Sequence, residues 1–333
     1  MTDVEPFAAG HARAGRVCVV GSLNMDLIVR TERLPAPGET VLGRDFTTLP
    51  GGKGANQAVA AARARAIVAM IGAVGRDAHG DALVQAVSAE GVDALHIARR
   101  DDAPTGTALI TVAGTVEHGE NTIVVAGGAN QALGAADVEL AEAAIADADA
   151  LLMSLETPIA PLIAAVSLAR RASRKPIVIL NAAPARDVPA ELLASIDCLV
   201  VNRLEAATIA QVSSSDSRAA CAELVRHGPT CVVLTLGREG ALAMVARAAH
   251  VATYGVPAFD VSTIDTVGAG DAFVGTLAAS LARGSALDDA LTLSAAAGAL
   301  ATTHRGAMPS LPTMSEVREL VASQPGVRVR RAT

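Results

Sequence analysis

The sequence predicts an α/β fold, in which a central, mostly parallel sheet carries helices on both faces and a small four-stranded β-sheet projects from it. From Asp137 onward, short apolar runs alternate with helix-like segments, which is the pattern of a parallel sheet with right-handed crossovers. Before that point, several extended segments are too polar at alternate positions to lie in the core, so they fit a second, projecting sheet.

Composition limits the class of protein. Of 333 residues, 51% are hydrophobic and 18% are charged, as expected for one large α/β unit with an appendage. A net charge of −7 and a near absence of aromatic residues argue against nucleic-acid binding. The apolar stretch Ala272–Ala282 is bounded by Asp271 and Arg283 and is too short to span a membrane. We therefore expect a small-molecule ligand and no nucleic-acid or membrane partner.

The four cysteines have no Cys-x-x-Cys spacing, and the histidines form no zinc pattern. Buried, reduced thiols and a cytoplasmic location are the expectation. Residues 1–15 contain two early acids and no apolar segment, so they are expected to form a disordered leader rather than a secretory signal. The main domain is expected over 16–322, with the projecting sheet at about 24–49 and 106–126 and a tail at 323–333.

Buried strands are predicted where apolar runs end in glycine or a polar residue. They are Arg16–Gly21, Ile67–Gly75, Ala150–Leu155, Ile177–Asn181, Cys198–Asn202 and Cys231–Leu236. Helices are predicted at about 79–90, 137–147, 158–172, 216–227, 269–282, 286–303 and 313–322. The runs 107–112 and 121–125 predict a hairpin that adds two strands to the projecting sheet.

The segment Ser22–Val29, the first predicted strand of the projecting sheet, carries two polar side chains on one face. Asn24 and Asp26 alternate with apolar residues, so an extended chain presents both on the same side. An Asp beside an Asn suits vicinal hydroxyls, because one accepts hydrogen bonds and the other both donates and accepts. A simple half-exposed strand is the alternative.

A glycine-rich turn at Gly51–Gly54 leads directly into an Ala-rich helix. Lys53 and Asn56 lie three residues apart and project from the same side of its first turn. The segment is neither a Walker P-loop nor a dinucleotide fingerprint, since both spacings are missing. The alternative is a glycine turn with a solvated lysine.

Polar residues follow most of the predicted strands. Ligands of such sheets bind beyond the carboxyl ends of the strands, so these residues are expected to converge there. They are Glu156, Asn181, Asn202, Glu205, Thr235 and Gly237.

The stretch Thr263–Phe273 joins a polar turn and small residues to a long apolar helix. Unpaired N–H groups at a helix start attract anions, and Gly268 and Gly270 allow a bulky group close to the backbone. Asp271 would repel an anion there, unless it takes a proton from the group that attacks the anion. An ordinary glycine turn with an acidic residue in the first helical turn is the alternative.

These motifs, taken together, resemble the ribokinase-like (phosphofructokinase-B-type) carbohydrate kinase family over roughly residues 16 to 322. The segments that carry the resemblance are Gly21–Asp26, Gly51–Ala58, Asn202–Glu205, Thr235–Gly237 and Asp265–Asp271. The lysine-containing form Gly52–Gln57 is similar to that of the ribokinase branch. The resemblance implies a cytoplasmic kinase that transfers phosphate from ATP to the 5-hydroxyl of D-ribose, with Mg²⁺ and an activating K⁺ as cofactors.

The resemblance also implies residue roles. Asp271 would be the catalytic base, and Gly268, Ala269 and Gly270 would form the anion hole for the transferring phosphoryl group. The sugar would be bound by Asn24, Asp26, Gly52, Lys53, Asn56, Glu156 and Asp271. The nucleotide would meet Asn202, Thr235, Gly237, Gly240 and Gly270, and Glu205 would act on Mg²⁺ through water. The K⁺ ligands would be Asp265, Val267, Ala301, His304, Gly306 and Ser310, mostly through backbone carbonyls.

The resemblance further implies that the four-stranded projecting sheet is the lid of the site and that a homodimer forms through this lid. Three positions depart from the family pattern: Ala295 replaces a polar residue expected near the adenine, His304 replaces a longer basic residue, and Arg65 replaces a helix-ending glycine. Two other functions fit the same residues. One is a nucleoside or other sugar kinase of the same family, and the other is a sugar-binding regulator that has lost activity.

Overall fold

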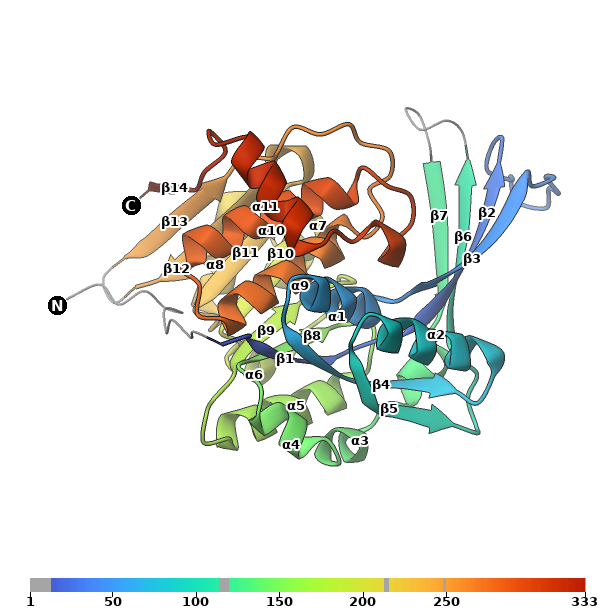
Figure 1. Cartoon of the computed structure of the whole chain (residues 1–333), viewed down its shortest axis with the longest axis horizontal. Coiled ribbons are helices and arrows are strands. Elements are labelled where there is room, and N and C mark those ends of the chain that lie inside the picture. The colour runs from blue at the N-terminus through green and yellow to red at the C-terminus, as the bar shows by residue number, and fades with distance from the viewer. Residues whose placement is uncertain (1–12, 114–119, 213–215, 248–249, 333) are drawn as a thin grey trace.

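The computed structural model describes residues 13–113, 120–212, 216–247 and 250–332. It contains a ten-stranded sheet and a separate four-stranded sheet (Figure 1). The strand order in the large sheet is β14-β13-β12-β11-β10-β9-β8-β1-β4-β5. Strands from β11 to β5 run parallel, whereas β12, β13 and β14 are antiparallel to their neighbours. The predicted fold class is confirmed.

The strands of the large sheet are short and mostly buried. Their bounds are β1 (Arg16–Val20), β4 (Ile67–Gly75), β5 (Asp93–Arg100), β8 (Ala150–Ser154), β9 (Ile177–Asn181), β10 (Cys198–Asn202), β11 (Cys231–Thr235), β12 (Ala241–Ala246), β13 (Val251–Val256) and β14 (Arg330–Ala332). Alternate residues of β1 face opposite sides: Val17 and Val19 enter one apolar core, and Cys18 and Val20 enter the other. Near-continuous apolar runs are therefore explained by burial on both faces.

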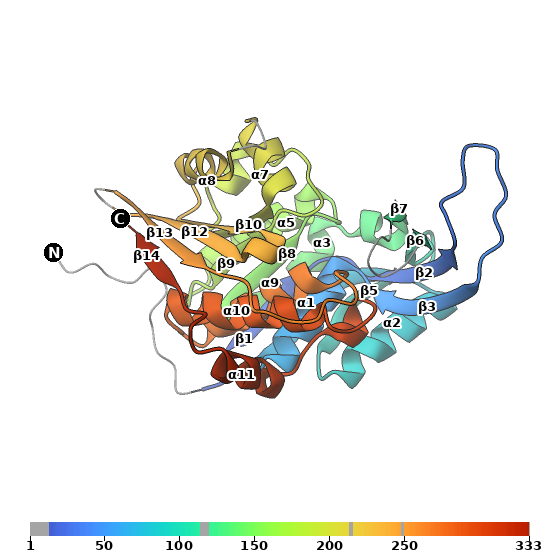
Figure 2. The same ribbon diagram turned by 90° about the horizontal axis from the view of Figure 1, so that it is seen from above.

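Two layers of helices cover this sheet (Figures 1 and 2). One core is shared with α1 (Lys53–Arg63), α2 (Ala78–Ala89), α9 (Ala269–Ala282), α10 (Leu287–Ala301) and α11 (Met314–Ser323). The other is shared with α3 (Ala135–Glu139), α4 (Glu142–Ala146), α5 (Ile159–Arg171), α6 (Ala190–Leu193), α7 (Arg203–Ala210) and α8 (Ser217–Arg226).

The small sheet consists of β2 (Asn24–Thr31), β3 (Asp45–Gly51), β6 (Gly106–Ala113) and β7 (Glu120–Ala126), in the order β3-β2-β6-β7. It projects beyond the large sheet at one end of the molecule (Figures 1 and 2). Only Gly21, Ser22 and Leu23 separate β1 from β2. Asn130 holds this junction, because its side chain accepts a hydrogen bond from Leu23 N and donates one to Leu23 O, both at 2.9 Å.

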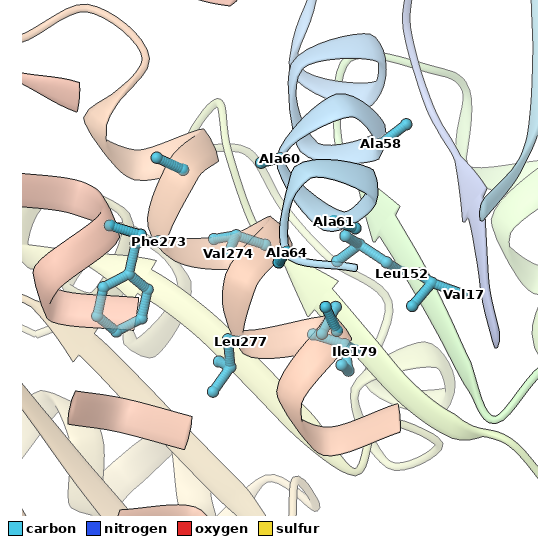
Figure 3. Packing of buried hydrophobic residues seen from close by; sticks show 14 of the residues in the cluster. Val17, Ala58, Ala60, Ala61, Ala64, Leu152, Ile179, Phe273, Val274 and Leu277 are labelled. Carbon is cyan, nitrogen blue, oxygen red and sulfur yellow. The ribbon is translucent and has the colours of Figure 1, made fainter. Parts of the chain in front are cut away.

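Helices α1 and α9 cross at close range, as Figure 3 shows from the buried side chains at their contact. Gly275 makes this possible, since a β-carbon there would lie 2.5 Å from both Gln57 O and Ala60 Cβ. A polar glycine turn begins each helix, so the close crossing brings the two helix starts together. This is the feature of the fold that builds the site.

The structure differs from the sequence-based expectations in several elements. The helix predicted at 137–147 is two short helices, α3 and α4, separated by Leu140 and Ala141. The strands β5, β12, β13 and β14 and the short helices α6 and α7 were not predicted. The expected tail contains β14, which pairs with β13. Of the expected leader, 1–12 lies outside the described residues, while Arg13 pairs with Asp149 at 2.8 Å.

Arg65 follows Ala64, the C-cap of α1, with φ 68°, the left-handed conformation for which a glycine had been expected. Among the described residues, no helix is long and apolar enough to cross a membrane.

Candidate active site

Asp271 lies in the first turn of α9, 8% exposed, and both of its carboxylate oxygens accept hydrogen bonds from α1. Asn56 Nδ2 donates to Oδ2 at 3.0 Å, and Gln57 Nε2 donates to Oδ1 at 2.9 Å. The glycine block and the α9 turn, which are more than 200 residues apart in sequence, therefore meet at this carboxylate. Asn56 keeps a buried amide oxygen with no partner among the described residues, which leaves an acceptor for a ligand hydroxyl.

The first residues of α9 offer backbone donors. Gly268 is the N-cap with φ 82°, and a β-carbon there would lie 2.9 Å from Ala307 Cα, so only glycine fits. Ala269 N donates to Thr266 O at 3.3 Å, while the N–H groups of Gly270 and Asp271 donate to no described group. Gly270 lies beside open space, because a β-carbon there would meet nothing within 4 Å. A free, outward-facing helix start of this kind binds anions.

Glu156 organises a second group of donors just beyond β8. Its Oε2 accepts from Ser22 Oγ, from Asn24 Nδ2 at 3.3 Å and from the backbone N–H of Lys53 at 3.2 Å. The carboxylate thus joins the β1–β2 junction to the start of α1. Asn24 in turn accepts from Asn130 Nδ2 through its Oδ1 at 2.8 Å.

Asp26 shares a face of β2 with Asn24, as the alternation predicted, and is 8% exposed. A β-carbon at Gly51 would lie 2.3 Å from Asp26 Oδ2, so the glycine makes room for the carboxylate. Its carboxylate has no hydrogen-bond partner among the described residues. Burial, together with the nearby carboxylates of Glu156 and Asp271, raises the pKa of Asp26 to about 7.

Lys53 is the cation of this group. Burial alone would lower the pKa of its ammonium, but the carboxylates of Asp271, Glu156 and Glu205 outweigh burial and raise the pKa. Gly52, the N-cap of α1, precedes it with φ 92°. The lysine therefore stays charged among carboxylates that come from three different parts of the chain.

The predicted nucleotide residues follow the next strands of the same sheet edge. Asn202 and Glu205 form a capping box at the start of α7: Glu205 N donates to Asn202 Oδ1 at 2.9 Å, and Asn202 N donates to Glu205 Oε2 at 2.8 Å. Burial raises the pKa of Glu205, and Asp271 adds to the effect, while the bond from Asn202 N and the charge of Lys53 oppose it. This capping role was not recognised in the sequence.

The other predicted nucleotide residues lie after β11. Thr235 Oγ1 donates to Val201 O at 3.4 Å, and Gly237 borders open space. A β-carbon at Gly240 would lie 2.0 Å from Val256 O, so Gly240 is required for packing against the end of β13. Ala295, the departure noted near the expected adenine position, is 8% exposed on α10.

The predicted cation ligands come from two loops that Asp265 ties together. Its Oδ1 accepts from Val267 N at 3.1 Å and its Oδ2 from Gly306 N at 3.0 Å. The carbonyl oxygens of Val267, Ala301, His304 and Gly306 accept no hydrogen bond from described residues. Ser310 donates its hydroxyl to Ala307 O at 2.8 Å, and the His304 ring lies 2.9 Å from Thr303 Oγ1.

Three residues at the site were not recognised as functional in the sequence. Gln57 was seen only as part of the glycine block, Asn181 only as a polar strand end, and Asn130 was not noted. Nothing in their local sequence distinguishes them, because each acts on a partner over 100 residues away.

A helix start with free N–H groups, a carboxylate held beside it and polar strand ends on one sheet edge are the parts of an α/β phosphotransferase site. Residues 14–314 match the profile described as pfkB family carbohydrate kinase. The chain therefore belongs to the pfkB family and is a carbohydrate kinase.

Individual relatives agree with this family. The chain is 38% identical to "Ribokinase" of Haemophilus influenzae over 306 residues, covering 91% of this chain and 97% of that protein. It is 36% identical to "Ribokinase" of Bacillus subtilis, covering 92% and 99%. The solved structure of Arabidopsis thaliana ribokinase complexed with ribose and ATP superposes with a TM-score of 0.82 at 30% identity, covering 93% and 99%.

Proposed function

We propose that this kinase transfers the γ-phosphoryl group of ATP to the 5-hydroxyl of D-ribose, with Asp271 as the general base. The observation that carries the proposal is the Asp271 carboxylate, held by Asn56 and Gln57 beside the free backbone N–H groups of α9. The names of the similar proteins support ribose and ATP as substrates, since one similar structure was solved with both.

The acceptor side is small and polar. Asn24, Asp26, Gly52, Lys53, Asn56 and Glu156 would bind the sugar hydroxyls. Asp26 and the unpartnered oxygen of Asn56 are the acceptors still open to a hydroxyl. No aromatic side chain is among these described residues, which favours a free pentose over a nucleoside.

Both proton removal and anion stabilisation would come from the start of α9. Asp271 would accept the proton of the attacking hydroxyl. The N–H groups at Gly268–Gly270 and the Lys53 ammonium would stabilise the negative charge that spreads over the phosphoryl oxygens. Phosphoryl transfer depends mainly on such positioning, and the small sheet would act as a lid that excludes water.

On the donor side, Asn202, Thr235, Gly237 and Gly240 would line the nucleotide site, with Gly270 at its phosphate end. Glu205 would hold Mg²⁺ through water, and its Oε1 has no described partner and suits that task. Mg²⁺, when bound, supplies charge neutralisation at the phosphates. The Asn202 side chain would serve the nucleotide through its Nδ2, because its Oδ1 caps α7.

A monovalent cation, K⁺, is proposed at the loops joined by Asp265. The donor set fits, because Val267, Ala301, His304 and Gly306 present carbonyl oxygens that no described group uses. Asp265 would supply the negative charge, and Ser310 would complete the set. The bound cation would fix the loop that positions Gly268.

A coupled assay of ADP release over D-ribose, 2-deoxyribose, fructose, adenosine and inosine tests the proposal, with Na⁺ and K⁺ compared. Turnover highest for D-ribose and stimulated by K⁺ is expected. A preference for adenosine or inosine would favour the nucleoside kinase instead. Ribose binding without any turnover would favour a sugar-binding regulator.

A homodimer through the small sheet is also proposed. Strand register places Phe46, Leu109 and Val124 on the face opposite Asp26, and these side chains are 63%, 52% and 64% exposed. An apolar face of this kind on a projecting sheet suits contact with a second copy of the chain.

A further inference from the structure

Behind Asp271, two buried amides form a chain of hydrogen bonds that begins at the backbone of β10. Asn181 Nδ2 donates to Val200 O at 3.2 Å. Gln57 Nε2 donates to Asn181 Oδ1 at 2.9 Å and also to Asp271 Oδ1 at 2.9 Å. Asn181 is 8% exposed and Gln57 is fully buried.

The direction of this chain is set by groups that cannot reverse. A backbone carbonyl only accepts, so Val200 O requires the NH₂ end of Asn181 and turns the Asn181 oxygen toward Gln57. That oxygen in turn requires the NH₂ end of Gln57. The two hydrogens of Gln57 Nε2 are then divided between Asn181 and Asp271.

The Gln57 amide also has an unsatisfied end. Its Oε1 is buried with no partner among the described residues. An unpaired buried oxygen is unfavourable, so Gln57 is not arranged for the best pairing of its own atoms. The arrangement instead keeps a donor on the carboxylate.

We infer that Gln57 and Asn181 are positioning residues for the general base, with Asn181 fixing the amide of Gln57 so that it always donates to Asp271. This rests on the proposed function of Asp271. A donor on one carboxylate oxygen stabilises the ionised form and fixes its orientation toward the acceptor hydroxyl.

Other charged groups around Asp271 act at longer range. Lys53 of α1 and Glu205 of α7 are near it, and Asp26 of β2 faces the same space. These groups are unchanged in the Gln57 and Asn181 variants. A change specific to the Gln57 variants is therefore attributable to the lost or altered donor.

The test compares kcat, KM for ribose and the pH dependence of kcat/KM in Gln57→Leu, Gln57→Glu and Asn181→Leu. Gln57→Leu should lower kcat by about tenfold to a hundredfold, the effect of one charge-assisted hydrogen bond. Its acidic limb should move to higher pH, while KM for ribose changes by less than about threefold. Asn181→Leu should give a smaller loss of the same kind.

Gln57→Glu separates positioning from mere packing. The introduced carboxyl group can still donate to Asp271 while it is protonated, whereas its ionised form repels Asp271. Activity of this variant should therefore be partly retained at low pH and fall as pH rises. Val59→Ala, a buried change two residues along the same helix, is the matched control for lost stability. It should keep the wild-type pH profile.

The results distinguish a failure of the positioning role of Gln57 from a failure of Asp271 as the proposed base. An inactive Asp271→Asn enzyme together with wild-type pH profiles in the folded Gln57 variants would overturn the positioning role alone. Near-wild-type turnover of Asp271→Asn would overturn the base itself. Thermal unfolding confirms that each variant is folded before its kinetics are compared.

Discussion

Asp271 is held by two neutral amides and by no described cation in hydrogen-bond contact. This arrangement suits a proton acceptor, because the two amides fix the position of the carboxylate beside the start of α9. Asp271→Asn should therefore lower kcat by about 10²–10⁴-fold while ribose binding stays within about an order of magnitude. Single-turnover kinetics and ribose titration measure the two effects separately.

If Asp26 binds the sugar as proposed, sugar binding should depend on pH. Burial and the neighbouring carboxylates raise its pKa to about 7 in the free protein. A sugar hydroxyl that donates to it favours the ionised form, so ribose binding should tighten as pH rises through about 7 and should release a proton. Calorimetry in buffers of different ionisation enthalpy measures that proton.

The effect of rising pH on the stability of the free protein is opposite to its effect on ribose binding. Between the ordinary value of 3.8 and about 7, the folded protein holds a proton on Asp26 that the unfolded chain has lost. The free energy of unfolding should therefore fall as pH rises across this window. Asp26→Asn should remove both effects, and unchanged proton release in that variant would assign the proton to another group.

The relative placement of side chains was predictable where a short spacing sets the geometry. Lys53 and Asn56 lie three apart at a helix start, and Asn24 and Asp26 lie two apart on a strand, so each pair was expected on one side. Asn130 and Asn181 were not predictable in this way. Their partners are set by the packing of distant elements, which no local pattern encodes.

The crossing of α1 and α9 places the amide donors of Asn56 and Gln57 against the Asp271 carboxylate. Gly275→Ala would put a β-carbon 2.5 Å from Gln57 O and Ala60 Cβ, forcing the helices apart. We expect a loss of about 1–3 kcal/mol in stability and a fall in kcat, since Asn56 and Gln57 move with α1. Chemical denaturation and steady-state kinetics measure these changes.

Gly255→Ala is the matched control, because a β-carbon at Gly255 meets nothing within 4 Å. Wild-type stability and kcat in that variant, alongside losses in Gly275→Ala, would assign the effect to the crossing. Equal behaviour of the two variants would contradict it.

Among the elements, buried parallel strands were predicted well because their apolar runs end in glycine or a polar residue. Strands β12 and β13 were missed because no helix separates them from β11, so the alternating pattern gave no sign of them. The short strand β14 was missed because its partner, β13, was itself unrecognised. Helices α3 and α4 were merged because their Ala-rich sequence continues through Leu140 and Ala141 without a break signal.

The proposed homodimer would form through the outer face of the small sheet. Leu109→Asp places a charge in the middle of that face and should shift the expected dimer to a monomer in light scattering after size exclusion. Leu140→Asp is the control, because Leu140 is 82% exposed outside the sheet. A wild-type mass in the Leu109 variant would place the dimer contact elsewhere, or show that the protein is a monomer.

The three-residue junction between β1 and β2 has a consequence for the sugar itself. Asn24 and Asp26 belong to the small sheet, whereas Glu156, Asn56 and Asp271 belong to the large domain. A pentose bound to both sets is then a reversible crosslink across this joint, adding to the hydrogen bonds that Asn130 and Glu156 already make there. Amide hydrogen exchange in β2 and β6 should slow when ribose is added, more than in β10 and β11.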